Sequence, residues 1–303
     1  MRHRLDHVRH DLGRWLPTLG GALAYRKFCT PHLSRHRSPD HEILVERARF
    51  HLRQAVRTRV ATSEGYVQAY VFAPEGKCHD VRTIPTVLFV HGWTAEAAFM
   101  TAFAEPFRKR GYRTILFDLP AHGESAGRQT NLIACAHSVR DVAEALGPIH
   151  FVVAHSLGGQ AALLAGGGGT PMPYAYPFRD YVLVSMPHRF ADVTRQFGAE
   201  EGLSPAAQRN YEQRLEQLAQ RRIEDFTGVN LLAEAGGKAL LLHARDDHEV
   251  PFGDAEEVMA SSPSAELQAF EGLGHRKILY APPVIRTALA YLKPAAEAIT
   301  RTA

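Results

Sequence analysis

Residues 149–159 read IHFVVAHSLGG, and this stretch decides the fold. The apolar run up to Ala154 is typical of a buried strand, and Leu157 opens a stretch typical of a helix. Ser156 lies at the junction, where a sharp turn holds the backbone in a strained conformation and exposes the hydroxyl. Such a turn needs small residues two positions away on either side, which Ala154 and Gly158 provide. The helix directs its positive end at Ser156 and so favours a negatively charged oxygen there.

Strand-like and helix-like segments alternate on both sides of this turn. Residues 86–90, 114–119, 181–185 and 239–243 are continuous apolar runs, residues 267–270 form a weaker one, and residues 66–73 alternate. Strands without polar alternation suit a parallel sheet that is covered on both faces. Helical patterns lie at 97–110, 132–146, 157–165, 253–261 and 283–292. This alternation predicts an α/β fold with a doubly wound, mostly parallel sheet.

Two segments fall outside that alternation. Residues 187–236 carry two helical patterns, at 189–197 and 205–222, and Ser204-Pro205 is a typical helix start. Helices inserted there would cover the carboxyl ends of the strands, where open α/β sheets bind ligands, so we predict a small helical cap. Residues 1–60 are predicted to be a basic, solvated arm with one short helix after Pro39. The core would then comprise residues 61–186 and 237–303.

The composition of the 303-residue chain is that of an ordinary globular protein. Hydrophobic residues make up 45% and charged residues 22%, which excludes a disordered chain, a collagen-like repeat and a coiled coil. The net charge is +3, but residues 1–60 hold 13 Lys and Arg against 5 Asp and Glu. That basic segment is compatible with contact to nucleic acid or anionic lipid, although a solvated arm is the simpler interpretation and no nucleic-acid partner is expected.

The expected location is the cytoplasm. Cys29, Cys78 and Cys135 are scattered and odd in number, which indicates neither a disulfide framework nor a zinc site. No apolar run approaches the roughly 18 residues of a membrane span. Residues 15–25 faintly resemble a signal peptide, but Pro17 and Gly20-Gly21 interrupt the stretch.

A serine hydroxyl is a weak nucleophile and needs a base, which should follow an acid later in the chain. Four histidines follow Ser156: His188, His243, His248 and His275. We predict His275 as the base because it ends the glycine-rich loop GLGH at 272–275. The segment RDDHEVP at 245–251 offers the acid, and its spacing to Val250-Pro251 favours Asp247 over Asp246. Asp247 would orient His275, and a role for Asp246 in holding the loop stays open.

Backbone N–H groups are the expected stabilisers of a negatively charged oxygen at this serine. One is that of Leu157, the residue after Ser156. The second is expected in the loop that follows the strand at 86–90, where His91-Gly92 precedes Trp93. We predict that Trp93 donates its backbone N–H and that its indole lines the substrate pocket. No metal or cofactor is expected, because neither a phosphate loop nor a zinc pattern is present.

The chain resembles the α/β-hydrolase superfamily, in the branch of bacterial esterases and lysophospholipases related to serine aminopeptidases. The resemblance rests on HGW at 91–93, FDLPAHGES at 117–125, AHSLGG at 154–159, DDHEVP at 246–251 and GLGH at 272–275. It covers about residues 65–293 and departs only at Ala154, where the family often has glycine. It implies an α/β-hydrolase fold and a carboxylesterase-type serine hydrolase acting on a small-molecule ester of small or medium acyl length. The family loop that contains His122 is implied to be structural.

Several alternatives stay open on the same residues. A thioesterase or a haloperoxidase-like enzyme would use the same triad, and a ligand-binding protein without turnover would retain the fold. A peptidase would need acids that hold the substrate's ammonium group, for which Glu200 and Glu201 in the cap are candidates. The sequence leaves the oligomeric state undecided.

Overall fold

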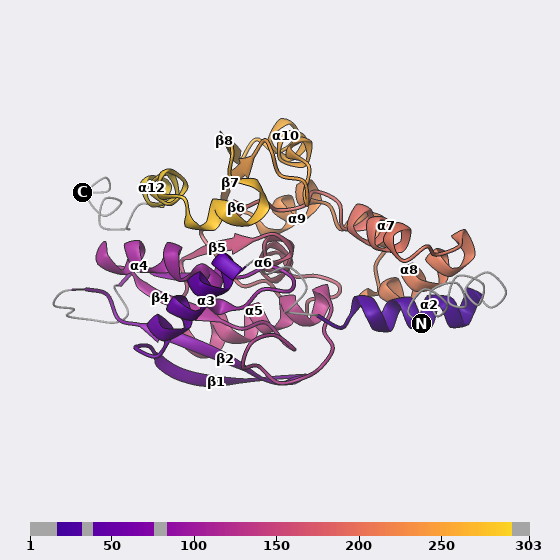
Figure 1. The fold of residues 1–303 in the computed structure, drawn as a ribbon, viewed down its shortest axis with the longest axis horizontal. Helices are drawn as coiled ribbons and strands as arrows, with labels where there is room; N and C mark the ends of the chain where they lie inside the picture. The colour runs from indigo at the N-terminus through magenta and orange to yellow at the C-terminus, as the bar shows by residue number, and fades with distance from the viewer. Residues whose placement is uncertain (1–16, 32–38, 76–83, 293–303) are drawn as a thin grey trace.

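Within residues 17–31, 39–75 and 84–292, which the computed structural model describes, eight strands form one sheet (Figure 1). Their order across the sheet is β1-β2-β4-β3-β5-β6-β7-β8. The strands are β1 (Val56–Thr62), β2 (Gly65–Phe72), β3 (Thr86–Val90), β4 (Arg113–Phe117), β5 (Phe151–His155), β6 (Asp180–Val184), β7 (Lys238–Ala244) and β8 (Ala265–Phe270). Only the pairs β1–β2 and β2–β4 are antiparallel. The predicted α/β fold with a mostly parallel sheet is confirmed.

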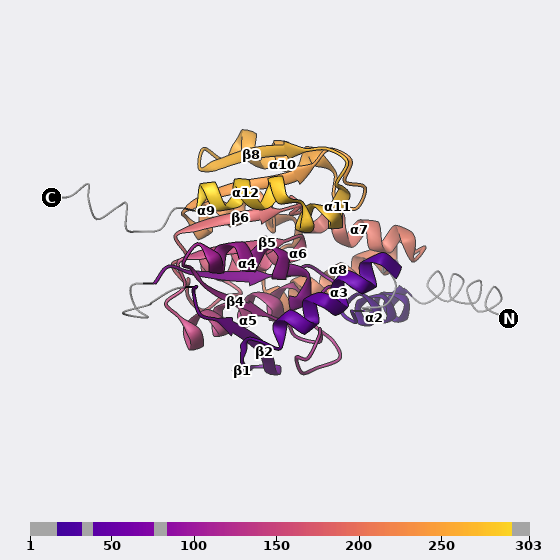
Figure 2. The same ribbon diagram turned by 60° about the vertical axis from the view of Figure 1, so that its left-hand side comes forward.

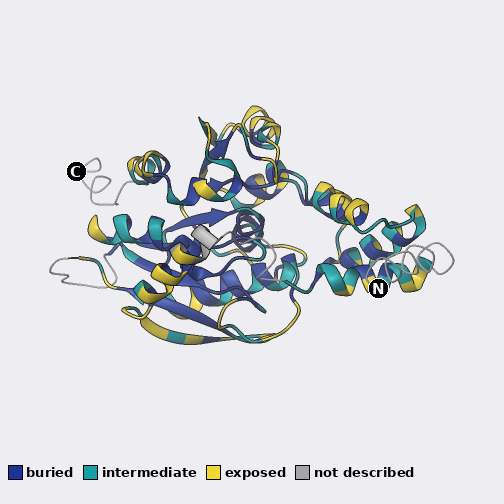
Figure 3. Ribbon diagram, viewed as in Figure 1, coloured by how far each residue is buried: buried dark blue, intermediate teal, exposed yellow. Residues whose placement is uncertain are grey.

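Helices cover both faces of the sheet, as the apolar strands required. One face carries α5 (Leu132–Leu146), α6 (Leu157–Gly167), α9 (Gly228–Ala235) and α10 (Phe252–Ser261). The other carries α3 (Pro39–Leu52), η1 (Ala97–Met100), α4 (Thr101–Lys109), η3 (Ile278–Tyr280) and α12 (Pro282–Tyr291). All five residues of β3 and of β5 are buried, because alternate side chains enter the two cores (Figure 3). These two apolar runs are thus the centre of the sheet.

The segment between β6 and β7 contains α7 (Phe190–Glu200), α8 (Pro205–Ala219), η2 (Ile223–Asp225) and α9. Ser204 caps α8 with its side chain and Pro205 is the first helical residue, as the sequence indicated. Helices α7 and α8 extend to one side of the sheet, beyond the strands, in both views (Figure 2). Helix α9 packs against α6 instead, so it belongs to the layers of the core.

The N-terminal segment differs from the expected solvated arm. Helix α2 (Pro17–Phe28) was not predicted, and it packs against α8. The close approach needs Gly21, because a Cβ there would lie 2.6 Å from the side-chain oxygen of Asn210. Strand β1 also begins inside the segment assigned to the arm and pairs with β2 along its whole length. The weak amphipathic pattern of both segments hid these tertiary contacts.

The part of the predicted arm at residues 1–16, and residues 293–303 of the predicted core, lie outside the described residues. None of the helices that the structure describes is long and apolar enough to cross a membrane.

Candidate active site

Ser156 forms the turn between β5 and α6. Its backbone has φ 52° and ψ −129°, a region that residues other than glycine rarely adopt. The Ser156 N–H donates to the carbonyl oxygen of Val184 at 2.9 Å, which ties the turn to β6. The residue is partly exposed although β5 before it and α6 after it are buried. The turn is as sharp as the sequence indicated, and it lifts Ser156 to the carboxyl edge of the sheet.

Two glycines allow the loop after β3 to lie directly against this turn. A Cβ on Gly158 would be 2.4 Å from the carbonyl oxygen of His91, which is backbone and has little room to move. A Cβ on Gly92 would be 2.9 Å from the Cβ of Ser156. Gly92 therefore lies directly beside the serine, and Trp93 is the next residue of the loop.

Asp247 lies in the loop after β7, and His275 lies in the short helix α11 (Gly274–Lys277) that follows β8, where the sequence predicted a loop. The Nδ1 atom of His275 lies 2.9 Å from the Oδ2 atom of Asp247. The other carboxylate oxygen accepts hydrogen bonds from the backbone N–H groups of Glu249 and Val250, each at 2.9 Å. Asp247 is 6% exposed and His275 is 8% exposed, so water does not compete for this pair.

The charge of Asp247 fixes the orientation of the imidazole. Burial alone would raise the pKa of the carboxyl, but hydrogen bonds from His243, His275 and the Val250 N–H together hold that pKa well below its usual range. A charged carboxylate at Nδ1 keeps the proton on that nitrogen and leaves Nε2 as the acceptor. Among the described residues no hydrogen bond joins Nε2 to the Ser156 hydroxyl, a contact that often forms only when substrate is bound.

His155 joins the serine turn to the loop of the candidate base. Its Nε2 atom lies 2.9 Å from the carbonyl oxygen of His275, and the two rings are 4.7 Å apart. Burial lowers the pKa of His155 well below its usual value, so the ring is neutral and Nε2–H is the donor. Because His155 directly precedes Ser156, this bond brings the serine and His275 together from segments 119 residues apart.

Asp246 fixes the loop that carries His275, a role that the sequence left open. Its two carboxylate oxygens accept from the backbone N–H groups of Leu273 at 3.3 Å and Gly274 at 3.1 Å. Arg276 adds a second link, donating to both carboxylate oxygens of Glu249 at 2.9 and 3.0 Å. The adjacent aspartates thus have different partners, since Asp246 holds the backbone of the loop and Asp247 holds its imidazole.

His155 and His243 were not recognised as site residues from the sequence. The Nε2 atom of His243 lies 3.0 Å from the carbonyl oxygen of Val250 and 3.5 Å from the Oδ2 atom of Asp247. Both histidines are at the ends of buried strands, where a core histidine is the ordinary interpretation. The available signal in the sequence was that His155 directly precedes Ser156 and that His243 lies four residues before Asp247.

The backbone N–H groups of Leu157 and Trp93 are the expected oxyanion donors. Neither has a hydrogen-bond acceptor among the described residues. Leu157 is the first residue of α6, so its N–H has no partner within the helix. Trp93 follows Gly92 in the loop that lies against Ser156.

Two buried histidines hold the Trp93 loop from behind. The Nε2 atom of His91 accepts from the Leu119 N–H at 2.9 Å, and that of His122 accepts from the Thr94 N–H at 3.2 Å. Burial lowers the pKa of His122 to about 4, so its Nε2 stays an acceptor at neutral pH. His122 is therefore a structural residue, as the resemblance implied.

An aromatic cluster connects Trp93 to the cap and to helix α2. The ring of Phe28 is stacked on Trp93 with centroids 6.0 Å apart and planes 18° apart. The Phe28 ring also makes edge-to-face contacts with three aromatic rings of the cap, at centroid distances of 5.1 to 6.1 Å: Phe190, Phe197 and Tyr211. Helix α2 thus closes one side of the region around Trp93, in addition to the cap that the sequence predicted.

The comparisons with known proteins agree with this fold. The family model described as "Alpha/beta hydrolase family" matches residues 87–286. The chain belongs to the alpha/beta hydrolase family. A sequence search of the curated proteins finds no match.

Similar solved structures share the fold at low sequence identity. Est1E from Butyrivibrio proteoclasticus is 16% identical with a TM-score of 0.60, over 81% of this chain and 99% of that one. A putative lipase, lip1, from Acinetobacter baumannii AYE is 18% identical with a TM-score of 0.60, over 89% and 100%. A membrane phospholipase A, a bacterial virulence factor, is 17% identical with a TM-score of 0.59, over 86% and 93%. At such identity these structures establish the fold alone.

Proposed function

We propose that this protein is a carboxylesterase-type serine hydrolase that cleaves esters of small or medium acyl chains. The observation that carries the proposal is the 2.9 Å contact between Asp247 and His275, linked through His155 to a serine in a strained turn. Esterases and lipases among the similar structures support a hydrolase of this kind. The division into a core and a cap belongs to the same proposal: α7 and α8 of the predicted segment 187–236 form the cap, α9 joins the core, and α2 is an added wall.

In this mechanism the reaction proceeds in two halves. The Ser156 hydroxyl attacks the acyl carbon while His275 Nε2 takes its proton, and the Leu157 and Trp93 N–H groups stabilise the oxyanion. His275 returns the proton to the departing alcohol as the carbon–oxygen bond breaks. Water, activated by His275, then releases the acid from Ser156 by the same steps. Asp247 stabilises the imidazolium in both halves.

The cap argues against peptidase activity. Glu201, one of the acids available for a substrate ammonium group, is already paired with Lys27 of α2. Glu200 lies exposed at the end of α7 and accepts a hydrogen bond from Gln196. Lys27 thus neutralises one acid of this pair, and Glu200, whose partner Gln196 is neutral, is left as a charge at the exposed end of the helix.

The proposal is tested by hydrolysis of p-nitrophenyl esters with acyl chains from two to sixteen carbons. Ser156→Ala should lower kcat by at least about 10³-fold, while the exposed Ser261→Ala on α10 should leave it unchanged. The length profile measures the size of the acyl pocket. A folded Ser156→Ala protein with near wild-type turnover would exclude Ser156 as the nucleophile. Acylation of the wild type without turnover would instead indicate the ligand-binding alternative.

A further inference from the structure

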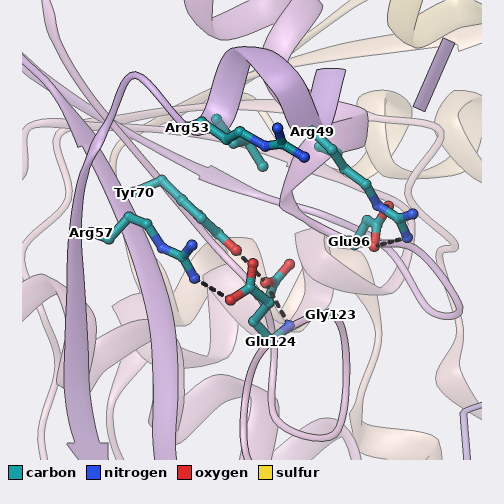
Figure 4. A pocket seen from close by; sticks show the side chains of 10 residues that line it. Arg49, Arg53, Arg57, Tyr70, Glu96, Gly123 and Glu124 are labelled. Atoms are coloured by element: carbon teal, nitrogen blue, oxygen red, sulfur yellow. Dashed lines mark hydrogen bonds and ion pairs between the residues drawn. The ribbon is translucent and has the colours of Figure 1, made fainter. Parts of the chain in front are cut away.

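A cavity under helix α3 lies apart from the candidate active site. It has a volume of about 330 Å³ and is enclosed by α3, strands β1 and β2, η1 and the loop after β4 (Figure 4). Its polar lining includes Arg49, Arg53 and Arg57, together with Glu96, Asp118 and Glu124. None of the residues proposed for catalysis lines it. Its volume is at the lower end of the range for small-molecule sites.

Two of the three arginines are neutralised by carboxylates in the cavity wall. Arg49 binds Glu96 through two nitrogens, at 2.8 and 2.9 Å, and Glu96 is nearly fully buried. Arg57 is paired with Glu124. These two pairs leave no net charge on that part of the wall.

Arg53 is the exception. It is exposed, and no carboxylate among the described residues pairs with it. Its closest interaction is with the Phe50 ring, 5.8 Å from the guanidinium carbon. Figure 4 shows its guanidinium over the cavity without a partner, while Arg49 and Arg57 are joined to their carboxylates. Arg53 is therefore the one arginine of the lining that none of the described carboxylates contacts, although Asp118, charged above its pKa of about 6, balances it over the cavity as a whole.

The floor of the cavity offers no competing polar site. Asp118 accepts from the N–H groups of Ala97 at 2.8 Å and Glu124 at 3.0 Å, and from the Tyr70 hydroxyl at 3.1 Å. These donors satisfy its oxygens, and burial raises its pKa to about 6. Leu52 and Ala98 supply apolar wall beside it. The cavity thus presents a forked cation at the rim and an apolar surface within.

We propose that this cavity binds a small organic carboxylate, with the carboxylate held by Arg53 and the apolar body against Leu52 and Ala98. The guanidinium fork matches the two oxygens of a carboxylate. A monoanion fits better than a phosphate dianion because the three wall carboxylates repel a second negative charge.

The occupant would also touch the segment that carries the proposed oxyanion donor. Glu96 and Ala98 line the cavity three and five residues after Trp93, and Asp118 holds the N–H of Ala97 between them. Occupancy should therefore slow hydrogen exchange of the backbone amides at 93–98. An influence on turnover would rest on the proposed function, but binding and exchange do not.

The test is calorimetric titration of the full chain with hexanoate, hexylammonium and inorganic phosphate. Hexanoate should bind the wild type and the Arg286→Ala control alike, since Arg286 is exposed on α12, away from the cavity. Arg53→Ala should weaken hexanoate binding by about tenfold or more, and Arg53→Lys by less, because lysine keeps the charge but lacks the fork. Hexylammonium should not bind in any variant. Equal melting temperatures would show that the exposed Arg53 substitutions leave the fold intact.

Three results would overturn the proposal. The first is no binding of hexanoate by the wild type at millimolar concentration. The second is equal binding by wild type and Arg53→Ala, which would locate hexanoate elsewhere, for example at the proposed catalytic serine. The third is binding of phosphate, but not of hexanoate, that depends on Arg53. Because no readout uses ester hydrolysis, these failures are separate from a failure of the proposed enzyme activity.

Discussion

The strained backbone of Ser156 leads to a prediction about stability. Its φ of 52° and ψ of −129° lie where a side chain is unfavourable, and such a conformation costs on the order of 1–3 kcal/mol. Ser156→Ala and Ser156→Gly both remove the hydroxyl, so both should be inactive. Only glycine removes the Cβ and with it the strain. This gain is opposed by the greater backbone freedom of glycine in the unfolded state, which lowers the free energy of unfolding by about 0.5–1 kcal/mol. We expect Ser156→Gly to be more stable than Ser156→Ala by about 1 kcal/mol.

Chemical unfolding with guanidinium, followed by circular dichroism, measures the difference. In thermal unfolding of a chain of this size, about 1 kcal/mol should appear as a melting-temperature difference of roughly 1.5 °C. The matched control is Ala233→Gly, at an exposed position inside α9. There the same exchange of alanine for glycine should lower the free energy of unfolding by about 0.5–1 kcal/mol. The sign of the effect should therefore differ between the two positions.

The reasoning is refuted if Ser156→Gly is less stable than Ser156→Ala by as much as Ala233→Gly loses. That outcome would mean that the turn stores no strain and that alanine is accommodated at position 156 without cost.

Three further predictions concern the groups around the serine. Asp247→Asn should lower kcat by about 10³- to 10⁴-fold. Because the pKa of Asp247 is lowered in the folded state, its charge stabilises the protein above the unfolded-state pKa of about 3.9, and this stabilisation is lost as the pH falls. The free energy of unfolding should therefore depend less steeply on pH in the acid range for Asp247→Asn than for the wild type. Identical acid unfolding curves would contradict the assignment. Asp246→Ala should lower the free energy of unfolding by about 1–3 kcal/mol and should lower kcat, and Asp246→Asn should lie between Asp246→Ala and the wild type. An unchanged kcat in steady-state kinetics would show that the N–H groups of residues 273 and 274 need no anchor. Phe28→Ala should lower the free energy of unfolding by about 2–4 kcal/mol and shift the preferred ester substrates towards longer acyl chains. Phe28→Leu should shift that preference less. An unchanged preference would show that α2 does not border the substrate region.

The structure changes how the N-terminal segment should be tested. Deleting residues 1–40 would remove α2 and expose the aromatic cluster, so a loss of hydrolysis would report on folding of the cap. A deletion that ends before Pro17 leaves α2 in place, and it isolates the basic residues at the N-terminus. That shorter deletion is the better test for a role of the arm in binding a partner.

Local sequence was enough to predict the centre of the fold. The runs at 87–90 and 151–154 are apolar at every position, which is typical of a sheet covered on both faces. The turn at Ser156 was predictable because strand, small residues and helix are contiguous. Asp247 and His275 were predictable as candidates because few acids and histidines follow Ser156 in suitable loops. In each case the deciding pattern lies within about ten residues.

Tertiary structure alone decided which distant groups support that site. His155 and His243 are strand-end histidines whose partners, the His275 carbonyl and Asp247, lie on other loops or across a turn. Helix α2 and strand β1 carry weak patterns of their own, and their stabilising contacts come from α8 and β2. Among the described residues Arg53 has no carboxylate partner although three carboxylates line the same cavity, and no spacing along the chain records that. A sequence encodes local conformational preference and periodic burial directly, whereas pairing between remote side chains exists only once the sheet has brought them together.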